Sequence, residues 1–502
     1  MLMTPDIVII GSGMGGASLA AGLAGSGAKV LILEKGERLA DTPETRDPRA
    51  IFQRGFFRPK EVWYDAADGS AFNPGNYYYV GGNSKFYGAV LIRYRAEDFG
   101  VLEHEGGISP AWPFGYDAIE PYYSRAEQLY RVRGELGGDP TEPYHSVPYD
   151  FAPVPDERPL AEVRARLAAT GLHPASLPLG VDIEAWLKRA QTPWDAFPDT
   201  RAGKMDAETC GLASALEDPD ITIETGAEVQ CLVAGADGRI DHIVYSQGGE
   251  TKTLSPKIVV LSAGAVKSAA MLLASKDERH PNGLANASDV VGRYFMNHNT
   301  TAMIAVDPRF RNDAVHQKTF GLNDFYLSDG KGGRPLGNIQ LLGRVSGPVM
   351  KAGVPLAPEW SLSWLASHAV DFLAMNEDLP DPESRIFVDG ERVVLQWKRS
   401  NMVAHQKLID AMKERLRAAG FPIVLTKPFD RRTPSHQCGT VRFGSDPATS
   451  ALDTNCRAHD HSNLFVVDAS FLPTSAAVNP ALTIAAQALR TADHMIATGF
   501  AA

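Results

Sequence analysis

Residues 6–36 read DIVIIGSGMGGASLAAGLAGSGAKVLILEKG, and this stretch decides the fold. Ile7–Ile10 form a short apolar, β-branched run, which is typical of a strand covered on both faces. A glycine-rich turn and an Ala- and Leu-rich helix follow, and a second apolar run covers Val30–Leu33. The stretch therefore predicts a strand, a turn, a helix and a second strand, the opening of a doubly wound α/β domain.

The turn carries the spacing G-x-G-x-x-G at Gly11, Gly13 and Gly16. In such a turn the glycines allow a tight bend, close approach of a pyrophosphate, and close packing of helix on strand. Glu34 ends the second strand 18 residues after Gly16, near the spacing of about 20 expected for a carboxylate that binds a ribose. The pattern predicts a dinucleotide site at the helix N-terminus, where free N–H groups attract phosphate; the alternative is a βαβ unit without a ligand.

Length and charge exclude several classes of protein. A chain of 502 residues suits two or three domains and can bury a large cofactor. Its 49 Lys and Arg against 60 Asp and Glu give a net charge of −11, so we expect no nucleic-acid partner. The four cysteines form no C-x-x-C pair and are expected to be free thiols.

The N-terminal letters MLMTPDIVII contain no basic segment, twin arginine or small-residue cleavage site. No stretch approaches the roughly 18 apolar residues of a membrane span. We therefore expect a cytoplasmic protein that does not enter a membrane.

Further along, dinucleotide-domain character returns twice, in residues 221–275 and in residues 464–497. Residues 134–199 are rich in proline and irregular, which indicates an excursion into a second domain or a lid. Residues 299–424 mix alternating strands with one amphipathic helix near residues 405–419. This part predicts an antiparallel sheet backed by helices.

One further stretch, TPSHQCGTVRFG at residues 433–444, places His436 two residues before Cys438. The local sequence fits four roles for His436: a metal ligand, the base of a cysteine nucleophile, a general base for other chemistry, or a packed ring with no chemical role. Without a C-x-x-C pair or a separate Cys/His cluster, a metal site is disfavoured. Motifs elsewhere in the sequence are needed to decide among the other three roles.

Several motifs in order carry a family resemblance: the N-terminal fingerprint, GGNS (81–84), VVLSAGAVKSAAMLLAS (259–275), VGRYFMNH (291–298), HQCGTVRFG (436–444) and VVDASFLPTSAAVNPALTIAAQAL (466–489). In this order they resemble the glucose-methanol-choline (GMC) family of FAD-dependent oxidoreductases. The stretches WPFGYDAIEPYYSRAEQLYRV (112–132) and GKMDAETC (203–210) look most like those of bacterial pyranose oxidases and glycoside 3-oxidases or 3-dehydrogenases.

The resemblance implies an α/β fold, α+β overall, with two domains. A discontinuous Rossmann-like FAD-binding domain is expected from residues 1–110, 200–298 and 431–502. Residues 111–199 and 299–430 are expected to form the substrate-binding domain, with a mainly antiparallel sheet backed by helices.

The resemblance also implies which residues hold FAD. Gly11, Gly13, Gly16 and Glu34 are expected at the ADP half, and Val229 is expected to meet the adenine through its backbone. The other expected cofactor residues are Met14, Gly81, Gly82, Asn83, Ser84, Gly264, Asp468, Ala469, Asn479, Pro480 and Thr483. The helix that opens at Pro480 should favour negative charge on the reduced flavin, and no metal is expected.

The implied chemistry is oxidation of a secondary hydroxyl of a sugar or glycoside at C2 or C3, with hydride transfer to flavin N5. His436 corresponds to the family's general base, and Asn479 corresponds to the residue that orients the same hydroxyl. Histidine suits the base because its pKa lies near working pH. O₂ is the expected electron acceptor, giving H₂O₂. The alternatives are a quinone- or protein-linked 3-dehydrogenase, a sterol or alcohol oxidase, and a lyase like the hydroxynitrile lyases.

Two positions depart from the family pattern. Phe86 stands where fungal pyranose oxidases attach flavin covalently through histidine, so we expect non-covalent FAD. Tyr87 stands where other members carry asparagine.

Some other residues are expected to be structural. Asp206 and Glu208 should cap or pair, and His459 and His461 should lie in a surface turn. Three aromatic residues could stack on a sugar but are expected in the core: Tyr326, Trp364 and Trp397.

Overall fold

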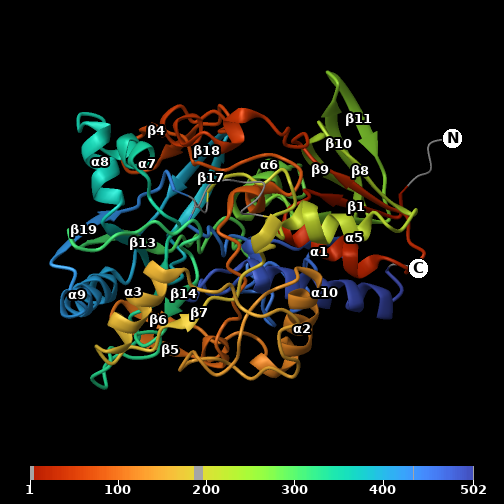
Figure 1. Cartoon of the computed structure of the whole chain (residues 1–502). Coiled ribbons are helices and arrows are strands. Elements are labelled where there is room, and N and C mark those ends of the chain that lie inside the picture. Colours follow the sequence, from red (N-terminus) through yellow and green to blue (C-terminus); the bar gives the residue numbers. More distant parts are fainter. Residues whose placement is uncertain (1–4, 186–195, 434, 501–502) are drawn as a thin grey trace.

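The computed structural model describes residues 5–185, 196–433 and 435–500, and Figure 1 shows its arrangement. Residues 1–4 of the N-terminal stretch MLMTPDIVII, and residues 186–195 of the proline-rich segment 134–199, lie outside these residues. Within the described ranges no helix is long and apolar enough to cross a bilayer.

A five-stranded parallel sheet forms the centre of the nucleotide-binding part. Its order is β20 (Leu464–Val466), β12 (Ile258–Leu261), β1 (Ile7–Ile10), β2 (Val30–Leu33) and β8 (Ile221–Glu224). The two strands predicted from the opening stretch are confirmed to the residue. All four residues of β1 are buried, as a covered parallel strand requires. Strands from three distant chain segments thus assemble one sheet.

Helices and a small antiparallel sheet surround this sheet. The helices are α1 (Met14–Leu23), α2 (Glu120–Leu129), α5 (Ala213–Ala215), α6 (Ala265–Ala274) and α10 (Ala481–Ala497). An antiparallel sheet of β11 (Glu250–Leu254), β10 (Ile240–Gln247) and β9 (Glu228–Ala234) projects at one side. Helix α1 packs against α10, where a Cβ on Gly22 would lie 2.7 Å from Cβ of Ala492. The small residues of both helices permit this close approach.

The second part of the molecule is a six-stranded antiparallel sheet. Its order is β19 (Ile423–Pro428), β13 (Asn299–Val306), β16 (Ala369–Asn376), β15 (Asn338–Leu341), β14 (Phe320–Leu322) and β7 (Ala175–Ser176). Four helices accompany it: α3 (Arg158–Ala168), α7 (Gly347–Gly353), α8 (Glu359–Ala366) and α9 (Met402–Ala418). The predicted face of α9, with Leu408, Met412 and Leu416, is buried in this core. The expected fold, a Rossmann-like domain beside an antiparallel sheet backed by helices, is confirmed.

Two small sheets complete the fold. Strands β17 (Arg385–Asp389), β18 (Arg392–Gln396), β3 (Trp63–Asp65) and β4 (Ala71–Phe72) form one, and β5 (Leu102–His104) pairs with β6 (Gly107–Ser109). The first joins chain segments that the sequence assigned to different domains, and the domain boundaries stay a prediction.

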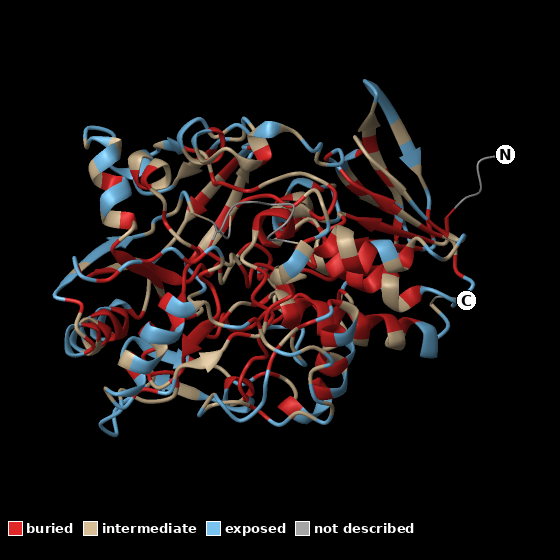
Figure 2. Cartoon of the chain, viewed as in Figure 1, coloured by how far each residue is buried: buried red, intermediate tan, exposed pale blue. Residues whose placement is uncertain are grey.

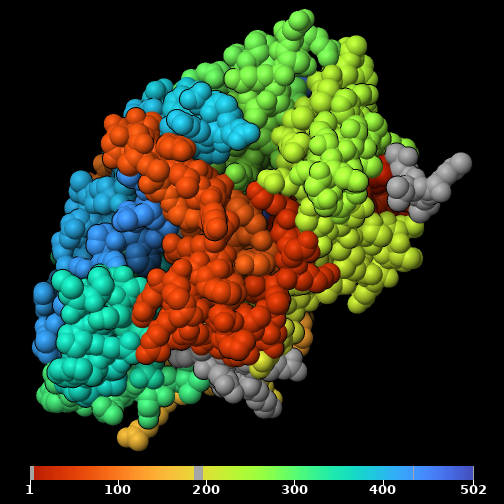
Figure 3. Space-filling model, turned by 90° about the horizontal axis from the view of Figure 1, so that it is seen from above, coloured from red at the N-terminus to blue at the C-terminus, as the bar shows by residue number. Residues whose placement is uncertain are grey.

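Burial follows the two cores. Buried residues gather in the central sheet, in α1 and α10, and on the inner face of α9 (Figure 2). Seen from above, the red N-terminal segment lies across the middle of the molecule, beside the teal residues of α7 and α8 (Figure 3). Arg49 pairs there with Glu359, and Gln53 donates to the carbonyl of Pro348.

Candidate active site

Two of the three fingerprint glycines are required by packing within the chain. Gly11 has φ +104°, and a Cβ there would lie 2.3 Å from the carbonyl oxygen of Ser262. A Cβ on Gly16 would lie 2.1 Å from the carbonyl oxygen of Gly11. Both positions therefore exclude any side chain, because backbone atoms already fill the space.

Gly13 is different, because space rather than protein lies beside it. A Cβ built on Gly13 meets no heavy atom of the described residues within 4 Å. Gly13 is the N-cap of α1, and the first turn of that helix contains no acidic residue. Gly82 closes one side, since a Cβ there would lie 3.6 Å from Cα of Gly13. Free N–H groups of α1 thus face an open position that suits a phosphate.

Glu34 is held at the end of β2. It is 5% exposed, and its carboxylate accepts hydrogen bonds from the backbone N–H of Ser12 at 2.9 Å, from the Ser12 hydroxyl at 2.7 Å and from the N–H of Gly36 at 2.8 Å. Burial raises the pKa of Glu34 despite these donors. The carboxylate therefore has a fixed place beside the glycine turn, where a ribose would meet it.

Hydrogen bonds within the chain hold several of the other expected cofactor residues. Ser84 donates to the carbonyl of Gly81, Gly264 donates to Asp468, and Asp468 also accepts from Ser268 and from the N–H of Ser470. The rest lie at the start of α1 (Met14), in the 3-10 helix η3, Gly82–Phe86 (Gly82, Asn83), on β9 (Val229), at the start of the 3-10 helix η7, Ala469–Phe471 (Ala469), and at the N-terminus of α10 (Asn479, Pro480, Thr483). The Thr483 hydroxyl is 2.7 Å from that of Tyr123.

These residues fit a dinucleotide. An open position at Gly13, helix N–H groups without a competing acid, and a buried carboxylate after β2 are the donor and acceptor set that an ADP group needs. The individual contacts of these residues with FAD stay predictions.

The structure brings His436 and Asn479 together. Nδ2 of Asn479 lies 3.2 Å from Nε2 of His436, although the residues are 43 apart in sequence. Asn479 precedes α10, and Pro480 is the N-cap of that helix rather than its first residue, so the expected position of Pro480 was wrong by one residue. His436 has φ +68°, a left-handed conformation that is uncommon outside glycine and often marks a functional site.

A short antiparallel bridge carries His436 to its neighbours. The backbone groups of Met296 and Cys438 exchange hydrogen bonds, and the N–H of His298 donates to the carbonyl of Ser435. Nδ1 of His298 thereby lies 2.9 Å from Nδ1 of His436. The buried His298 was not singled out as a site residue in the sequence, although it lies in the quoted motif VGRYFMNH.

Strand β15 contributes a second residue that sequence reasoning missed. Nε2 of Gln340 lies 3.0 Å from Oδ1 of Asn479, and Gln340 is 1% exposed. Its Oε1 has no hydrogen-bond partner among the described residues. A signal was present, since Asn338 and Gln340 are amides two residues apart in an otherwise apolar strand, and so face one side of the sheet.

The site keeps His436 neutral. Burial lowers the pKa of His436 well below 6.5, and the neighbouring His298 and Lys318 lower it further. A neutral imidazole near pH 7 can accept a proton, which a general base must do.

Other candidates lie outside this arrangement. Asp206 caps the π-helix η6 (Ala207–Leu212) by accepting from the N–H of Thr209, and with Glu208 it pairs with the buried Lys85, as expected of structural residues. The four cysteines are free, and Cys438 is buried. Among the described residues no group of three His, Cys, Asp or Glu side chains could hold a metal.

Two further expectations were wrong. His461 does not lie in a surface turn: it is fully buried, and Nδ1 lies 2.6 Å from the carbonyl oxygen of Gly238. Trp364 is not a core residue, since it is 49% exposed on α8 and stacks on His368. Tyr326 is buried and donates to Asp98, and Trp397 donates to Asp378.

The side chains of Phe86 and Tyr87 both contact other residues of the chain. Phe86 stacks on Tyr77 with ring centres 3.7 Å apart, and the Tyr87 hydroxyl donates to the carbonyl of Met205.

Two family models match the chain. Residues 391–488 match the GMC oxidoreductase model of the C-terminal part, and residues 9–57 match the NAD(P)-binding Rossmann-like domain. These ranges include His436 and Asn479 in the first, and the glycine turn with Glu34 in the second.

Curated relatives match along nearly the whole chain. 6'''-hydroxyparomomycin C oxidase of Streptomyces lividus is 28% identical over 98% of this chain and 92% of its own. The fructose dehydrogenase large subunit of Gluconobacter japonicus is 27% identical over 98% of both chains. Paromamine 6'-oxidase of Streptomyces fradiae is 28% identical over 97% of this chain and 90% of its own.

The fold is also found in a solved structure. Pyridoxine 4-oxidase from Mesorbium loti superposes with a TM-score of 0.64 over 98% of this chain and 99% of its own, at 19% identity. This likeness concerns the fold alone.

Proposed function

Because this chain is a GMC oxidoreductase whose cofactor is FAD, we propose that it oxidises a secondary hydroxyl of a sugar or glycoside, at C2 or C3, to a ketone. The contact of 3.2 Å between His436 and Asn479 carries the proposal. The printed names of relatives that match nearly the whole chain, oxidases of aminoglycosides and a fructose dehydrogenase, support a polyhydroxylated substrate.

His436 acts as the general base. Nε2 faces Asn479 and takes the proton of the substrate hydroxyl, while the lowered pKa of His436 keeps the ring unprotonated beforehand. FAD, when bound, supplies the acceptor for the hydride that leaves the same carbon. Since the amide of Asn479 cannot titrate, His436 is the residue of this pair that takes the substrate proton.

Asn479 and Gln340 orient the substrate. Gln340 holds Oδ1 of Asn479, so the Asn479 amide nitrogen is directed at Nε2 of His436, and a substrate hydroxyl beside this pair can contact both atoms. The unpaired Oε1 of Gln340 is a buried acceptor, and a buried acceptor without a partner costs about 1–3 kcal/mol. A second hydroxyl of a sugar would satisfy it, which favours a polyol over a simple alcohol.

O₂ takes up the two electrons and two protons to give H₂O₂. A dehydrogenase that uses a quinone or protein acceptor is the second candidate, and the match to a fructose dehydrogenase large subunit over 98% of both chains favours it.

Anaerobic mixing of the FAD-loaded protein with a panel of sugars and glycosides tests the proposal. We expect glucose or a glucoside to bleach the visible flavin band, and either the 2-deoxy or the 3-deoxy sugar to fail, which identifies the carbon. NMR of the product should show a ketone at that carbon. Admission of air separates the candidates: rapid return of the band with H₂O₂ supports the oxidase, and a persistent bleached state supports the dehydrogenase. Failure of every sugar and glycoside to bleach the band contradicts the proposal and favours a lyase.

A further inference from the structure

Both ring nitrogens of His436 have a hydrogen-bond partner, and those partners decide which nitrogen carries the proton. Nδ1 faces His298 and Nε2 faces Asn479. Only the Nδ1–H tautomer leaves Nε2 free to accept a proton. The inference below rests on the proposed function, in which Nε2 is the accepting atom.

The first anchor lies behind His298. Nε2 of His298 is 2.9 Å from the carbonyl oxygen of Ser475 and 3.0 Å from that of Ala476. Carbonyl oxygens only accept hydrogen bonds, so Nε2 of His298 must carry the hydrogen. Burial lowers the pKa of His298 and keeps it neutral, which leaves its Nδ1 bare. Nδ1 of His436 must therefore be the donor across the contact of 2.9 Å.

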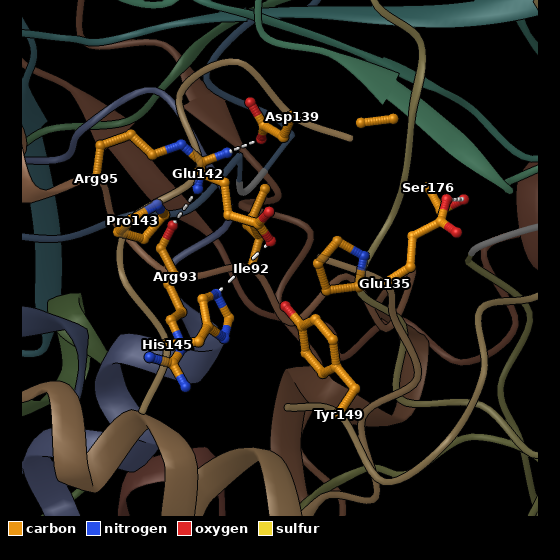
Figure 4. Close-up of a pocket in the computed structure, with 12 residues that line it drawn as sticks. Ile92, Arg93, Arg95, Glu135, Asp139, Glu142, Pro143, His145, Tyr149 and Ser176 are labelled. Atoms are coloured by element: carbon orange, nitrogen blue, oxygen red, sulfur yellow. Dashed lines mark hydrogen bonds and ion pairs between the residues drawn. The ribbon is translucent and has the colours of Figure 1, made fainter. Parts of the chain in front are cut away.

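The second anchor is the carboxylate of Asp139. Asp139 forms an ion pair with Arg95, as Figure 4 shows, and accepts hydrogen bonds from Thr141. Nδ2 of Asn323 also donates to it. Because an ionised carboxylate only accepts, the Asn323 amide must turn its nitrogen to Asp139 and its oxygen to the next residue.

The orientation of the Asn323 amide fixes the donor and acceptor ends of the amides that follow it. We define these four side chains as the amide chain: Asn323, Asn338, Gln340 and Asn479. Nδ2 of Asn338 donates to Oδ1 of Asn323 at 2.7 Å, and Nε2 of Gln340 donates to Oδ1 of Asn338 at 3.3 Å. The same Nε2 donates to Oδ1 of Asn479 at 3.0 Å. Asn479 must then present its nitrogen to Nε2 of His436.

The two anchors independently determine the same tautomer of His436. From the carbonyls of Ser475 and Ala476, His436 is a donor at Nδ1; from the carboxylate of Asp139, it is an acceptor at Nε2. We propose that His298 and the amide chain are positioning elements that lock His436 as the Nδ1–H tautomer, which leaves Nε2 without a hydrogen as the atom that accepts the proton of the substrate hydroxyl.

The middle of the lock is buried, whereas His436, Asn479 and Asp139 are half-buried. Asn323, Asn338 and Gln340 are 5%, 2% and 1% exposed, and His298 is 1% exposed. Water therefore does not compete for these groups, and the tautomer is set by the partner on the far nitrogen. Reversal of either nitrogen of His436 would place two donors or two acceptors face to face.

The direct test is the tautomer itself, measured by ¹⁵N NMR of the histidine rings in the oxidised, FAD-loaded protein without substrate. The His436→Gln spectrum assigns the signals of His436. We expect a protonated Nδ1 and a bare Nε2 in the wild type. A protonated Nε2 overturns the proposal.

Variants test whether the anchors cause the tautomer. His298→Phe removes the first anchor and Asn338→Leu interrupts the second, so each alone leaves one anchor in place. We expect each to slow anaerobic flavin reduction about 10- to 100-fold, the usual effect of a residue that fixes a histidine tautomer from behind. The double variant should exceed the product of the two losses, because only then can Asn479 and His436 reverse together.

Two further variants exclude a general loss of stability. His298→Asn keeps an acceptor opposite Nδ1 of His436 and should recover most of the rate. Asn312→Leu removes an equally buried amide of the same sheet region, bonded to Gln317 and to the carbonyl of Ala369 instead. It should leave the tautomer and the rate unchanged. An unchanged tautomer in the double variant overturns the proposal.

Failure of this inference and failure of the proposed function look different. If His436→Gln keeps the wild-type rate of flavin reduction, the base assignment is lost whatever the tautomer. If that variant is slow but the double variant is fast with an unchanged tautomer, the base stands and the lock is rejected.

Discussion

The amide nitrogen of Asn479 lies 3.2 Å from Nε2 of His436, and the amide oxygen of the same Asn479 accepts a hydrogen bond from Gln340. The α10 N-terminus, the segment around His436 and strand β15 therefore meet at one small polar group. A hydroxyl placed at this group would have a base on one side and an amide donor on the other.

The space beside Gly13 leads to a prediction on cofactor binding. Gly13→Ala adds a methyl group that meets no described atom, at φ −69°, where alanine is unstrained. We expect the melting temperature of the FAD-free protein to stay within about 2 °C, whereas the affinity for FAD falls at least about tenfold, because the methyl group enters the phosphate position. Fluorescence titration with FAD measures the affinity.

Gly115→Ala is the matched control. Gly115 is also an N-cap, has φ −83°, and would place its Cβ in open space among the described residues. Gly115→Ala should change neither the melting temperature of the FAD-free protein nor the affinity for FAD. Unaltered FAD affinity in Gly13→Ala would remove the α1 N-terminus from the cofactor site.

A second prediction concerns the attachment of FAD. Phe86 cannot form a covalent bond to flavin and is stacked on Tyr77. Acid precipitation should therefore release all of the yellow colour into the supernatant, where chromatography should identify intact FAD. Flavin that stays with the denatured pellet would show a covalent bond elsewhere in the chain.

The pH dependence of the half-reaction follows from the environment of His436. Its pKa is lowered by burial, by His298 and by Lys318. A base is lost when it is protonated, so the rate of flavin reduction should fall only as pH drops through this lowered pKa. We expect an acid limb below pH 6.5, the ordinary histidine value. Stopped-flow rates between pH 4.5 and pH 8 measure it, and a limb above pH 7 would contradict the assigned base.

Stability should depend on pH through Asp371 on β16. Burial raises the pKa of Asp371 to about 7, although Val345 and Gln317 donate to it. The folded state thus holds a proton that the unfolded chain releases near pH 4, so this residue destabilises the fold as pH rises from about 4 to about 7. Urea unfolding measures the free energy of unfolding at pH 5 and pH 8. Relative to the wild type, this free energy should be higher for Asp371→Asn at pH 8 than at pH 5. An equal difference at both pH values would contradict the raised pKa.

Local sequence was sufficient for the nucleotide-binding opening. Ile7–Ile10, the glycine turn and Val30–Leu33 are specified by neighbours within about thirty residues, and each appears where it was predicted. The face of α9 was likewise readable, because helical spacing places Leu408, Met412 and Leu416 together.

The rest of the site depends on contacts between distant segments. His298 meets His436 across 138 residues, and Gln340 meets Asn479 across 139. Spacing in sequence carries no information on such pairs. His461 was misplaced for the same reason, since its burial depends on the carbonyl of Gly238, 223 residues away.

The central claim is that His436 removes the substrate proton, and single-turnover reduction of bound FAD tests it most directly. His436→Ala removes the ring, and His436→Asn retains a residue that tolerates φ +68°. With FAD content and melting temperature kept, we predict that anaerobic reduction by the sugar identified above slows by about 10² to 10⁴ in both variants. A rate within about threefold of the wild type in either variant would contradict the account.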